Sequence, residues 1–505
     1  MVAHRTRPNP SRPPQVDEGA VAPNDTSRPS HRLLTLVILI AAGFPGACRR
    51  PSEPTIDLPN IVVITIDTLR ADHLGCYDYF RDTSPTIDAL AAESVFFERC
   101  IVPMATTLPT HTSIFTGTYP LEHGILANYK HGGFQFVPSP KLSSFAQIAR
   151  QAGYQTAAFV SATPVKSGTG IETGFDTFDE PSNKERHAGR TTEAVLRWLR
   201  DRDPKPFLLW VHYFDPHSPY APPPPYDTRY STDEQLESYL ARARFADRSR
   251  RPGGKSITTR TAINAYDGEI RYTDDQLAKL FGALKAQGLW DDSIVVLMGD
   301  HGEGLGQHNV PGHAHIWDEQ LHVPLMIRIP GAAPQRVARP MSAVDVLPTL
   351  LGLIDLPNSK SFLEQMSGVD ALSNADNPRY ILSRLSDRQL RFDMAMTYSI
   401  TGGRWKYLHA IGGEKQLFDL RSDPYQLRDV AADHPQVVRD YCARLQDQVT
   451  RQIARGADLG SGAVKPLSET RRRDLRDLGY VEDDTGELVE PTEEVIECPS
   501  VQAPP

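Results

Sequence analysis

The sequence predicts an α/β fold with a large, mostly parallel sheet flanked by helices, followed by a small C-terminal antiparallel sheet with a helix. Strand and helix patterns alternate through most of the chain, which is typical of a parallel sheet covered by helices. Continuous apolar runs rich in β-branched residues indicate buried parallel strands. Three such runs lead directly into acidic or histidine residues: 60–66, 206–211 and 293–299.

The ends of these three strands carry metal-type ligands. The first ends at Asp67, the second runs into the segment 212–217, and the third ends at Asp300-His301. Open α/β sheets bind ligands outside the carboxyl ends of their strands. We therefore expect one crevice to collect Asp67, Asp215, His217, Asp300 and His301, which is the layout of a metal-dependent hydrolase. His212 directly follows the apolar run, and we interpret it as a packed histidine.

The remaining elements follow from local periodicity and turn signals. In chain order we expect a helix entering a strand within 88–97, a helix at 143–153 and a strand at 156–160, a helix at 191–200, a surface insertion at 226–260 and a long helix at 265–287. In the C-terminal unit, Gly-Gly turns separate short strands at 398–400, 404–408 and 416–420, and a helix follows at 434–454.

The chain of 505 residues is long enough for one large domain and a smaller companion. Its net charge of −9 argues against a broad nucleic-acid surface, so no nucleic-acid partner is expected. The expected organisation is a disordered leader with a signal and lipobox (1–48), a linker (49–58), the main α/β domain (59–378), a C-terminal subdomain (379–460) and a tail (461–505).

The N-terminal residues predict an export signal. Residues 33–42 form an apolar run that is too short to span a bilayer but fits the core of a secretory signal. Gly46-Ala47 before Cys48 resembles a bacterial lipoprotein processing site, with Cys48 as the lipidated residue. We expect an exported protein, periplasmic or anchored to the membrane through lipid; an uncleaved anchor is the alternative. The other four cysteines allow three full pairings, and the sequence does not choose among them.

The segment 105–117 is the second key motif. Pro109 suits the first turn of a helix, which places Thr107 at or near its N-cap. Backbone N–H groups there favour an anion. Taken alone, the Thr107 hydroxyl is either a plain helix cap or a nucleophile.

With the surrounding strands, this motif resembles the sulfatase branch of the alkaline phosphatase superfamily. That branch carries C-x-P-S-R-x-S-x-x-T-G, and residues 107–117 (TLPTHTSIFTG) lie in the same register. The resemblance continues through 66–75, 214–220 and 299–303, and a "DL-x-x-DP" pattern of the sulfatase C-terminal subdomain matches 419–424. It covers roughly residues 59–450, and it implies a sulfatase-like α/β fold and ester hydrolysis.

Four departures from the family pattern bear on the chemistry. Thr107 replaces the cysteine that sulfatases oxidise to formylglycine, and threonine cannot be converted in that way. Cys100 lies seven residues too early to replace it. His111 stands in place of the motif arginine, and Thr68 in place of a second aspartate. The Gly-Lys-x-His segment of arylsulfatases is also absent after residue 153.

The resemblance implies that Asp67, Asp300 and His301 hold a divalent ion against Thr107, which attacks phosphorus or sulfur. A hydroxyl needs such activation to react near neutral pH. A carboxylate and histidine ligand set favours Zn²⁺ or Mn²⁺, with Ca²⁺ or Mg²⁺ as alternatives. An alternative with a second metal places it on Asp215, His217 and His315.

The remaining site residues also follow from the resemblance. His217 is the candidate acid for the leaving group, Asn128 the candidate contact to the substrate oxygens, and His313 or His315 stands where sulfatases carry a substrate-binding lysine. His111 is counted with the catalytic residues. Asp72 and His73 are interpreted as loop residues and not ligands, and His322 as a strand-edge residue.

The expected function is therefore an exported, metal-dependent hydrolase of sulfate or phosphate esters, with a sulfuric ester hydrolase, a phosphodiesterase and a phosphotransferase all open. The threonine favours phosphoryl over sulfuryl chemistry. The substrate would be a small-molecule, glycan or lipid-headgroup ester. The alternative is a catalytically inactive lipoprotein that binds glycans or lipid headgroups.

Overall fold

A computed structural model describes residues 58–498, apart from the gaps 130–133, 137–138, 183–184, 247–248, 251–255, 355, 357–358, 374–377, 393, 461–463, 467, 471 and 474–495. The described residues belong to one compact unit. The leader with Cys48 lies outside the described residues, as do most of the linker and tail. The expected boundaries at 378/379 and 460/461 stay predictions. No helix among the described residues is both long and apolar enough to cross a membrane.

The predicted α/β architecture is confirmed. The large sheet has the order β11-β2-β10-β9-β1-β6-β4-β5, with β12 beside β2. The three ligand-bearing strands are neighbours at its centre: β1 (Asn60–Ile66) pairs in parallel with β6 (Phe207–Tyr213) and with β9 (Ser293–Gly299). The other strands are β2 (Val95–Ile101), β4 (Gln155–Phe159), β5 (Thr177–Asp179), β10 (His322–Arg328), β11 (Gln335–Val337) and β12 (Met341–Ser342). β10 runs antiparallel to both of its neighbours, β9 and β2.

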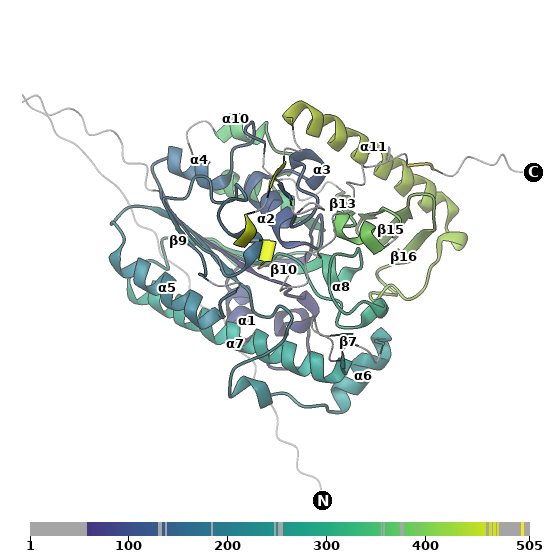
Figure 1. Cartoon of the computed structure of the whole chain (residues 1–505), viewed down its shortest axis with the longest axis horizontal. Helices are drawn as coiled ribbons and strands as arrows, with labels where there is room; N and C mark the ends of the chain where they lie inside the picture. Colours follow the sequence, from purple (N-terminus) through teal and green to yellow (C-terminus); the bar gives the residue numbers. More distant parts are fainter. Residues whose placement is uncertain are drawn as a thin grey trace, which may run out of the picture. The chain divides into compact units, whose positions relative to one another are not determined.

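Helices cover both faces of this sheet, as Figure 1 shows for α5 and α7 on one side and α2 and α4 on the other. Side chains of β1 alternate between the two cores, because successive residues of a strand point to opposite faces. Ile61 and Val63 pack with α2 (Thr107–Thr116), α4 (Phe145–Gln151) and α9 (Val346–Leu353). Val62 and Ile64 pack with α1 (Pro85–Ala92), α5 (Ala188–Asp201) and α7 (Thr259–Ala286).

The segment 226–260 is more than the surface insertion that the sequence predicted. Its helix α6 (Glu234–Ala243) buries Leu236 and Tyr239 in the core on the α7 side of the sheet. The alternating charged residues hid this apolar stripe, which recurs at helical spacing. The remaining short elements are α3 (Pro120–His123), α8 (Asp318–Leu321), α10 (Ser359–Leu363), and the two-stranded pairs β3 (Phe134–Phe136) with β17 (Val464–Pro466) and β7 (Ser249–Arg250) with β8 (Ser256–Ile257).

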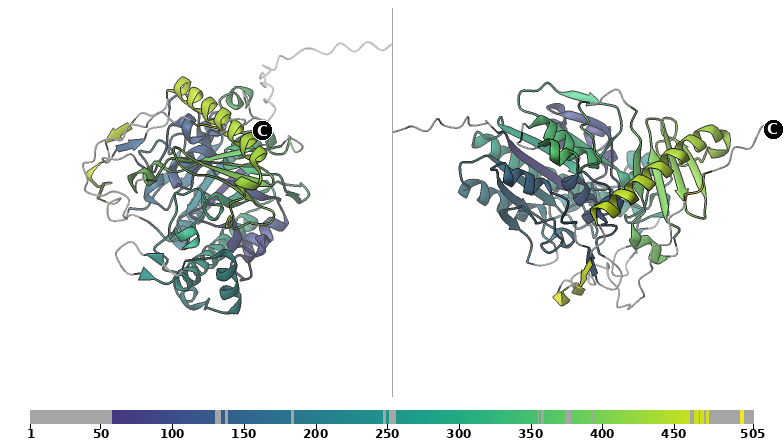
Figure 2. Two further views of the ribbon diagram at one scale, coloured as in Figure 1. Left: turned by 90° about the vertical axis from the view of Figure 1, so that its right-hand side faces the viewer. Right: turned by 90° about the horizontal axis from the view of Figure 1, so that it is seen from above.

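The C-terminal unit is an antiparallel sheet with a packed helix, as predicted. It has four strands: β13 (Ile381–Arg384), β14 (Thr397–Thr401), β15 (Trp405–Ala410) and β16 (Lys415–Asp419). The long helix α11 (Pro435–Leu459) lies along this sheet (Figure 2). A disulfide joins Cys442 of α11 to Cys498, which resolves the pairing that the sequence left open.

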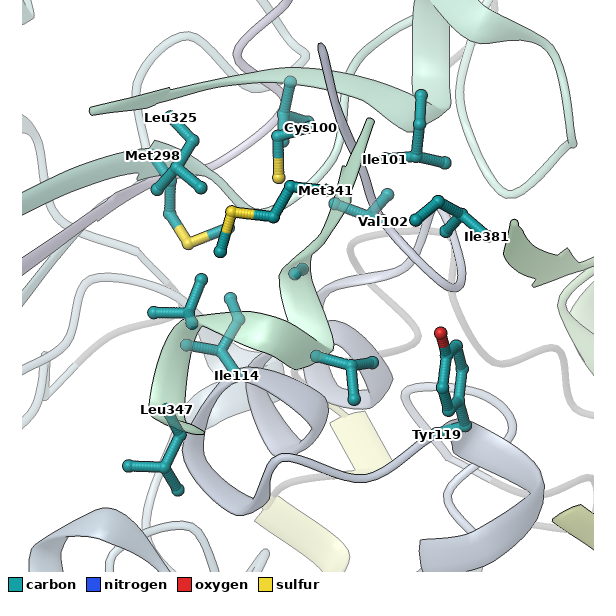
Figure 3. Packing of buried hydrophobic residues seen from close by; sticks show 14 of the residues in the cluster. Cys100, Ile101, Val102, Ile114, Tyr119, Met298, Leu325, Met341, Leu347 and Ile381 are labelled. Atoms are coloured by element: carbon teal, nitrogen blue, oxygen red, sulfur yellow. The ribbon is translucent and has the colours of Figure 1, made fainter. Parts of the chain in front are cut away.

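Cys100 lies in the core and not at the strand ends. It is fully buried in β2 and lies among Met341, Met298 and Leu325 (Figure 3). Burial raises the pKa of its thiol far above the usual range, so this thiol stays protonated and inert.

Candidate active site

The parallel register brings the predicted ligands together. Beyond β1, the Asp67 N–H donates to the Tyr213 carbonyl of β6, and the Asp300 N–H donates to the Ile66 carbonyl of β1. These bonds prolong the sheet by one residue on each strand and bring both carboxylates to the same edge. The Asp300 carboxylate is itself fixed, because its Oδ1 accepts from the N–H groups of Thr68 (3.1 Å) and His301 (2.7 Å).

Thr68 makes the sharp turn after Asp67. It has a left-handed φ of 54°, which is strained for a β-branched residue and common at functional sites. Its hydroxyl donates to the carbonyl of Pro216 (3.1 Å). Thr68 therefore stabilises the turn, and its side chain is engaged away from the ligand set.

Asp67, Asp300 and His301 form a group of candidate metal ligands whose atoms lie within 4.8 Å of one another. His301 Nε2 is 3.5 Å from Asp67 Oδ1 and 3.7 Å from Asp300 Oδ2. His301 Nδ1 lies 3.0 Å from the carbonyl of Gly302, so Nδ1 carries the proton and Nε2 presents a lone pair. A Cβ at position 302 would lie 2.1 Å from the Glu319 carbonyl oxygen, so glycine is required there.

The electrostatics of this group fit a divalent cation. Burial raises the pKa of both carboxyls, and a neighbouring acid raises it further: Glu303 beside Asp67, and Asp67 beside Asp300. Burial also lowers the pKa of His301 to about 3. Asp67 Oδ1 and Asp300 Oδ2 are buried and make no hydrogen bond to the described residues. Buried charges without partners are costly, and a cation between these atoms would remove that cost.

Thr107 lies beside this group. It is the first residue of α2, and the preceding Thr106 occupies the N-cap position in extended conformation without a side-chain cap bond. The Thr107 hydroxyl is 3.3 Å from His301 Nε2 and fully buried. Pro109 is the third helical residue and lies in the first turn, as expected. The hydroxyl is directed to the ligand group and does not serve as a plain helix cap.

His111 requires a correction, because we expected it among the catalytic residues. Its Nδ1 donates to the Thr107 carbonyl (2.8 Å), and its Nε2 accepts from the Thr65 hydroxyl (2.9 Å). Trp210 Nε1 donates to the same hydroxyl (2.9 Å), which fixes the direction of this chain of bonds. Both ring nitrogens are engaged, so His111 ties α2 to β1 and has no nitrogen left for substrate or metal. His111, His212 and Asp300 lie close enough together for a metal site, but His111 has no free nitrogen to serve as a ligand there.

Asn128, His217 and His313 lie near the first turn of α2 and near His301, and their roles stay predictions. Asn128 Oδ1 accepts from the Leu108 N–H (2.8 Å), so only its amide N–H group can donate to a substrate. The His313 ring lies 4.4 Å from that of His301 and 5.5 Å from that of His217. Gln389, from the C-terminal unit, donates to the His313 carbonyl (3.3 Å) and so holds the loop that carries it.

The alternative second metal site is not supported. Asp215 accepts from the Ala188 N–H (2.7 Å) at the start of α5 and lies 3.1 Å from His187 Nδ1. Asp215, His217 and His315 do not form a ligand group among the described residues. Asp215 instead holds the N-terminus of α5, where a carboxylate is favoured. His315 is placed by its backbone N–H, which donates to Gln320 (2.9 Å).

His212 is the site residue that sequence reasoning missed. It is fully buried in β6, opposite Thr65 of β1, and its Nε2 is 3.7 Å from Asp67 Oδ2. Its spacing in the sequence, two residues after Trp210 and five before His217, does not indicate a site residue. Only the register of β6 against β1 indicates that it faces the ligand group.

Asp72 and His73 lie in a short 3-10 helix (Ala71–His73) and not in a loop, and His322 is the first residue of β10. His73 Nδ1 contacts the buried Asp267 (2.7 Å), Asp72 pairs with the buried Arg70 (2.8 Å), and His322 Nε2 lies 3.0 Å from the Glu98 carbonyl.

Known proteins resemble this chain over the region that contains the site. A family model described as "Sulfatase" matches residues 59–356. The ulvan-active sulfatase of Formosa agariphila is 27% identical over 441 residues, which cover 79% of this chain and 82% of the relative. The multifunctional alkaline phosphatase superfamily protein PehA of Trinickia caryophylli is 24% identical over 491 residues, with coverages of 76% and 94%. The phosphonate monoester hydrolase of Agrobacterium radiobacter has a similar structure (TM-score 0.59, 22% identity), covering 82% of this chain and 98% of that protein.

Proposed function

The chain belongs to the sulfatase family, and we propose that it is a hydrolase of phosphate or sulfate esters that uses Thr107 as its nucleophile and a divalent metal ion as its cofactor. The observation that carries this proposal is the position of the Thr107 hydroxyl. It lies 3.3 Å from His301 Nε2, beside two buried carboxylates that each have one oxygen atom without a hydrogen bond to the described residues.

Asp67, Asp300 and His301 are the residues that would hold the ion, and Thr107 lies within its reach. The two carboxylates and one imidazole favour Zn²⁺ or Mn²⁺. When bound, the ion would acidify a hydroxyl and neutralise charge on the transferring group.

Each of the chain's own residues then has a separate role in the reaction. The Thr107 oxygen attacks phosphorus or sulfur, which forms a covalent ester and releases the alcohol; water or a second alcohol resolves the ester. His217 donates a proton to the leaving alcohol. The Asn128 amide N–H group binds a remaining oxygen of the transferring group, where donors stabilise developing charge. His313 Nδ1 donates to the Ala105 carbonyl (3.1 Å), so His313 binds such an oxygen through Nε2 in its imidazolium form.

Phosphoryl transfer is favoured over sulfuryl transfer, because the residue that sulfatases convert to formylglycine is Thr107. The similarity to PehA and to a phosphonate monoester hydrolase supports this choice, and the ulvan-active relative supports a glycan substrate. We propose a small-molecule, glycan or lipid-headgroup ester as substrate.

Export is part of the proposal. The Cys442–Cys498 disulfide supports it, because disulfides persist in oxidising compartments. A periplasmic location, with lipid attached at Cys48, fits the leader sequence. The inactive, headgroup-binding alternative is not favoured, because Thr107, Asp67, Asp300 and His301 are all retained and converge.

The test is Thr107→Ala, assayed on an aryl phosphate monoester, an aryl phosphodiester and an aryl sulfate with and without chelator. We expect hydrolysis to fall at least about a thousandfold while metal content and thermal stability persist. Thr112→Ala is the matched control, because this hydroxyl bonds only within the helix, to the Leu108 carbonyl (2.8 Å). Equal activity of Thr107→Ala and the unmodified enzyme would refute the covalent mechanism.

A further inference from the structure

The imidazole of His212 has a fixed tautomer. The Ser161 N–H, just beyond β4, donates to His212 Nδ1 (3.3 Å). A backbone N–H can only donate, so Nδ1 holds the lone pair. A neutral imidazole has one lone pair on its ring nitrogens, and Nε2 must therefore carry the proton.

The segment that sets this tautomer is itself well anchored. The Ser161 hydroxyl donates to the His212 carbonyl (2.6 Å) and contacts the Thr191 hydroxyl (2.6 Å). Ser161 and Thr191 are both buried, so the N–H of Ser161 is held against the ring by bonds on both sides.

His212 and His301 thus present opposite chemistry to one carboxylate. His301 Nε2 has a lone pair and lies 3.5 Å from Asp67 Oδ1. His212 Nε2 has a proton and lies 3.7 Å from Asp67 Oδ2. The Nε2 atom is buried and makes no hydrogen bond within the described residues. Asp67 Oδ2, 3.7 Å away, lies just beyond hydrogen-bond distance, so a small shift of this carboxylate would make it the acceptor. The Asp300 carboxylate also lies near the ring, but its Oδ1 already accepts from two backbone N–H groups.

We propose that His212 is a positioning residue: its Nε2–H donates to Asp67 Oδ2 and turns Oδ1 toward the cation, and His212 is not itself a metal ligand. This inference rests on the metal site of the proposed function. Hydrogen bonds of this kind orient metal-binding carboxylates, and their loss commonly weakens metal binding 10–100-fold.

The experiment titrates Mn²⁺ or Zn²⁺ into metal-free protein without substrate, in competition with a chromophoric chelator. Three variants separate the roles of the ring. His212→Leu removes the donor. In His212→Gln the amide nitrogen reaches the Nε2 position, and in His212→Asn it reaches only the Nδ1 position. Thr192→Val is the control, because it removes a buried hydroxyl contact to Tyr213 of the same strand (2.9 Å) and touches no site residue.

We expect Kd for the metal to rise about 10–100-fold in His212→Leu and His212→Asn, and to stay within about threefold of the unmodified protein in His212→Gln and Thr192→Val. If His212→Leu fails to fold, the comparison of Gln with Asn decides. Equal affinities of those two variants overturn the proposal, and so does a complete loss of binding in His212→Gln, which would make the ring a ligand. If the unmodified protein binds no divalent ion, the proposed function fails instead, and the two failures are distinct.

Discussion

Removal of divalent metal should destabilise the fold by an amount that follows from two atoms. Asp67 Oδ1 and Asp300 Oδ2 are buried and accept no hydrogen bond from the part of the chain that the structure describes. Leaving a buried polar atom unsatisfied costs about 1–3 kcal/mol, so the metal-free site should lose about 2–6 kcal/mol in the free energy of unfolding. For a unit of about 450 residues, unfolding entropy of about 2 cal/mol/K per residue converts this loss into about 2–6 °C in Tm.

Asp300→Asn tests the same reasoning from the opposite direction. Oδ1 accepts from two backbone N–H groups, and an asparagine oxygen can keep both bonds. The amide nitrogen then replaces Oδ2, which removes one of two neighbouring buried charges. We expect the metal-free variant to be at least as stable as the metal-free unmodified protein, and to gain no stability from added metal.

The assay is differential scanning calorimetry after dialysis against EDTA, repeated after Mn²⁺ or Zn²⁺ is returned. Asp203→Asn is the control, because this carboxylate is exposed and pairs only with Lys205 within the surface turn. A chelation shift of the same size in Asp300→Asn and in the unmodified protein would refute the assignment. No shift in the unmodified protein would refute the estimate from the two unsatisfied atoms.

Two further predictions concern the C-terminal unit. Burial alone raises the pKa of Asp318, but the charges of Lys406 and Arg99 outweigh it and hold that pKa well below the usual range. The pairing therefore contributes stability above about pH 4 that is lost as the pH falls. The free energy of unfolding, measured in urea between pH 5 and 3, should fall less steeply in Asp318→Asn than in the unmodified protein, by up to about 1.4 kcal/mol per pH unit. Equal slopes in the two proteins would contradict this. Cys498→Ser opens the disulfide to Cys442, across a separation of 56 residues, and should lower the free energy of unfolding by about 2–4 kcal/mol. Dithiothreitol should then destabilise the unmodified protein but not the variant, and equal sensitivity of both proteins would count against the bond.

The central strands were predictable because their apolar runs are long and uninterrupted and because each ends in charged or histidine residues. The direction of β10 was not, since an antiparallel strand in a buried sheet has the same apolar pattern as a parallel one. The contribution of α6 to the core was also hidden, because its apolar residues recur at helical spacing within a charged segment.

Among the site residues, the sequence predicted that Asp67, Asp300 and His301 converge, because the ends of neighbouring strands fix where these side chains lie. The place of Thr107 beside them followed from the family resemblance, since a helix start alone is equally compatible with a plain cap. The roles of His111, Asp215 and His212 were decided by the tertiary structure alone. Each depends on a hydrogen bond to a residue at least four positions away: to Thr107 and Thr65, to Ala188, and to Ser161. A histidine or carboxylate acts as a ligand, a donor or a helix cap according to which of its atoms are hydrogen-bonded within the fold. Those partners are distant in the sequence, so only the packed structure shows which atoms are bonded.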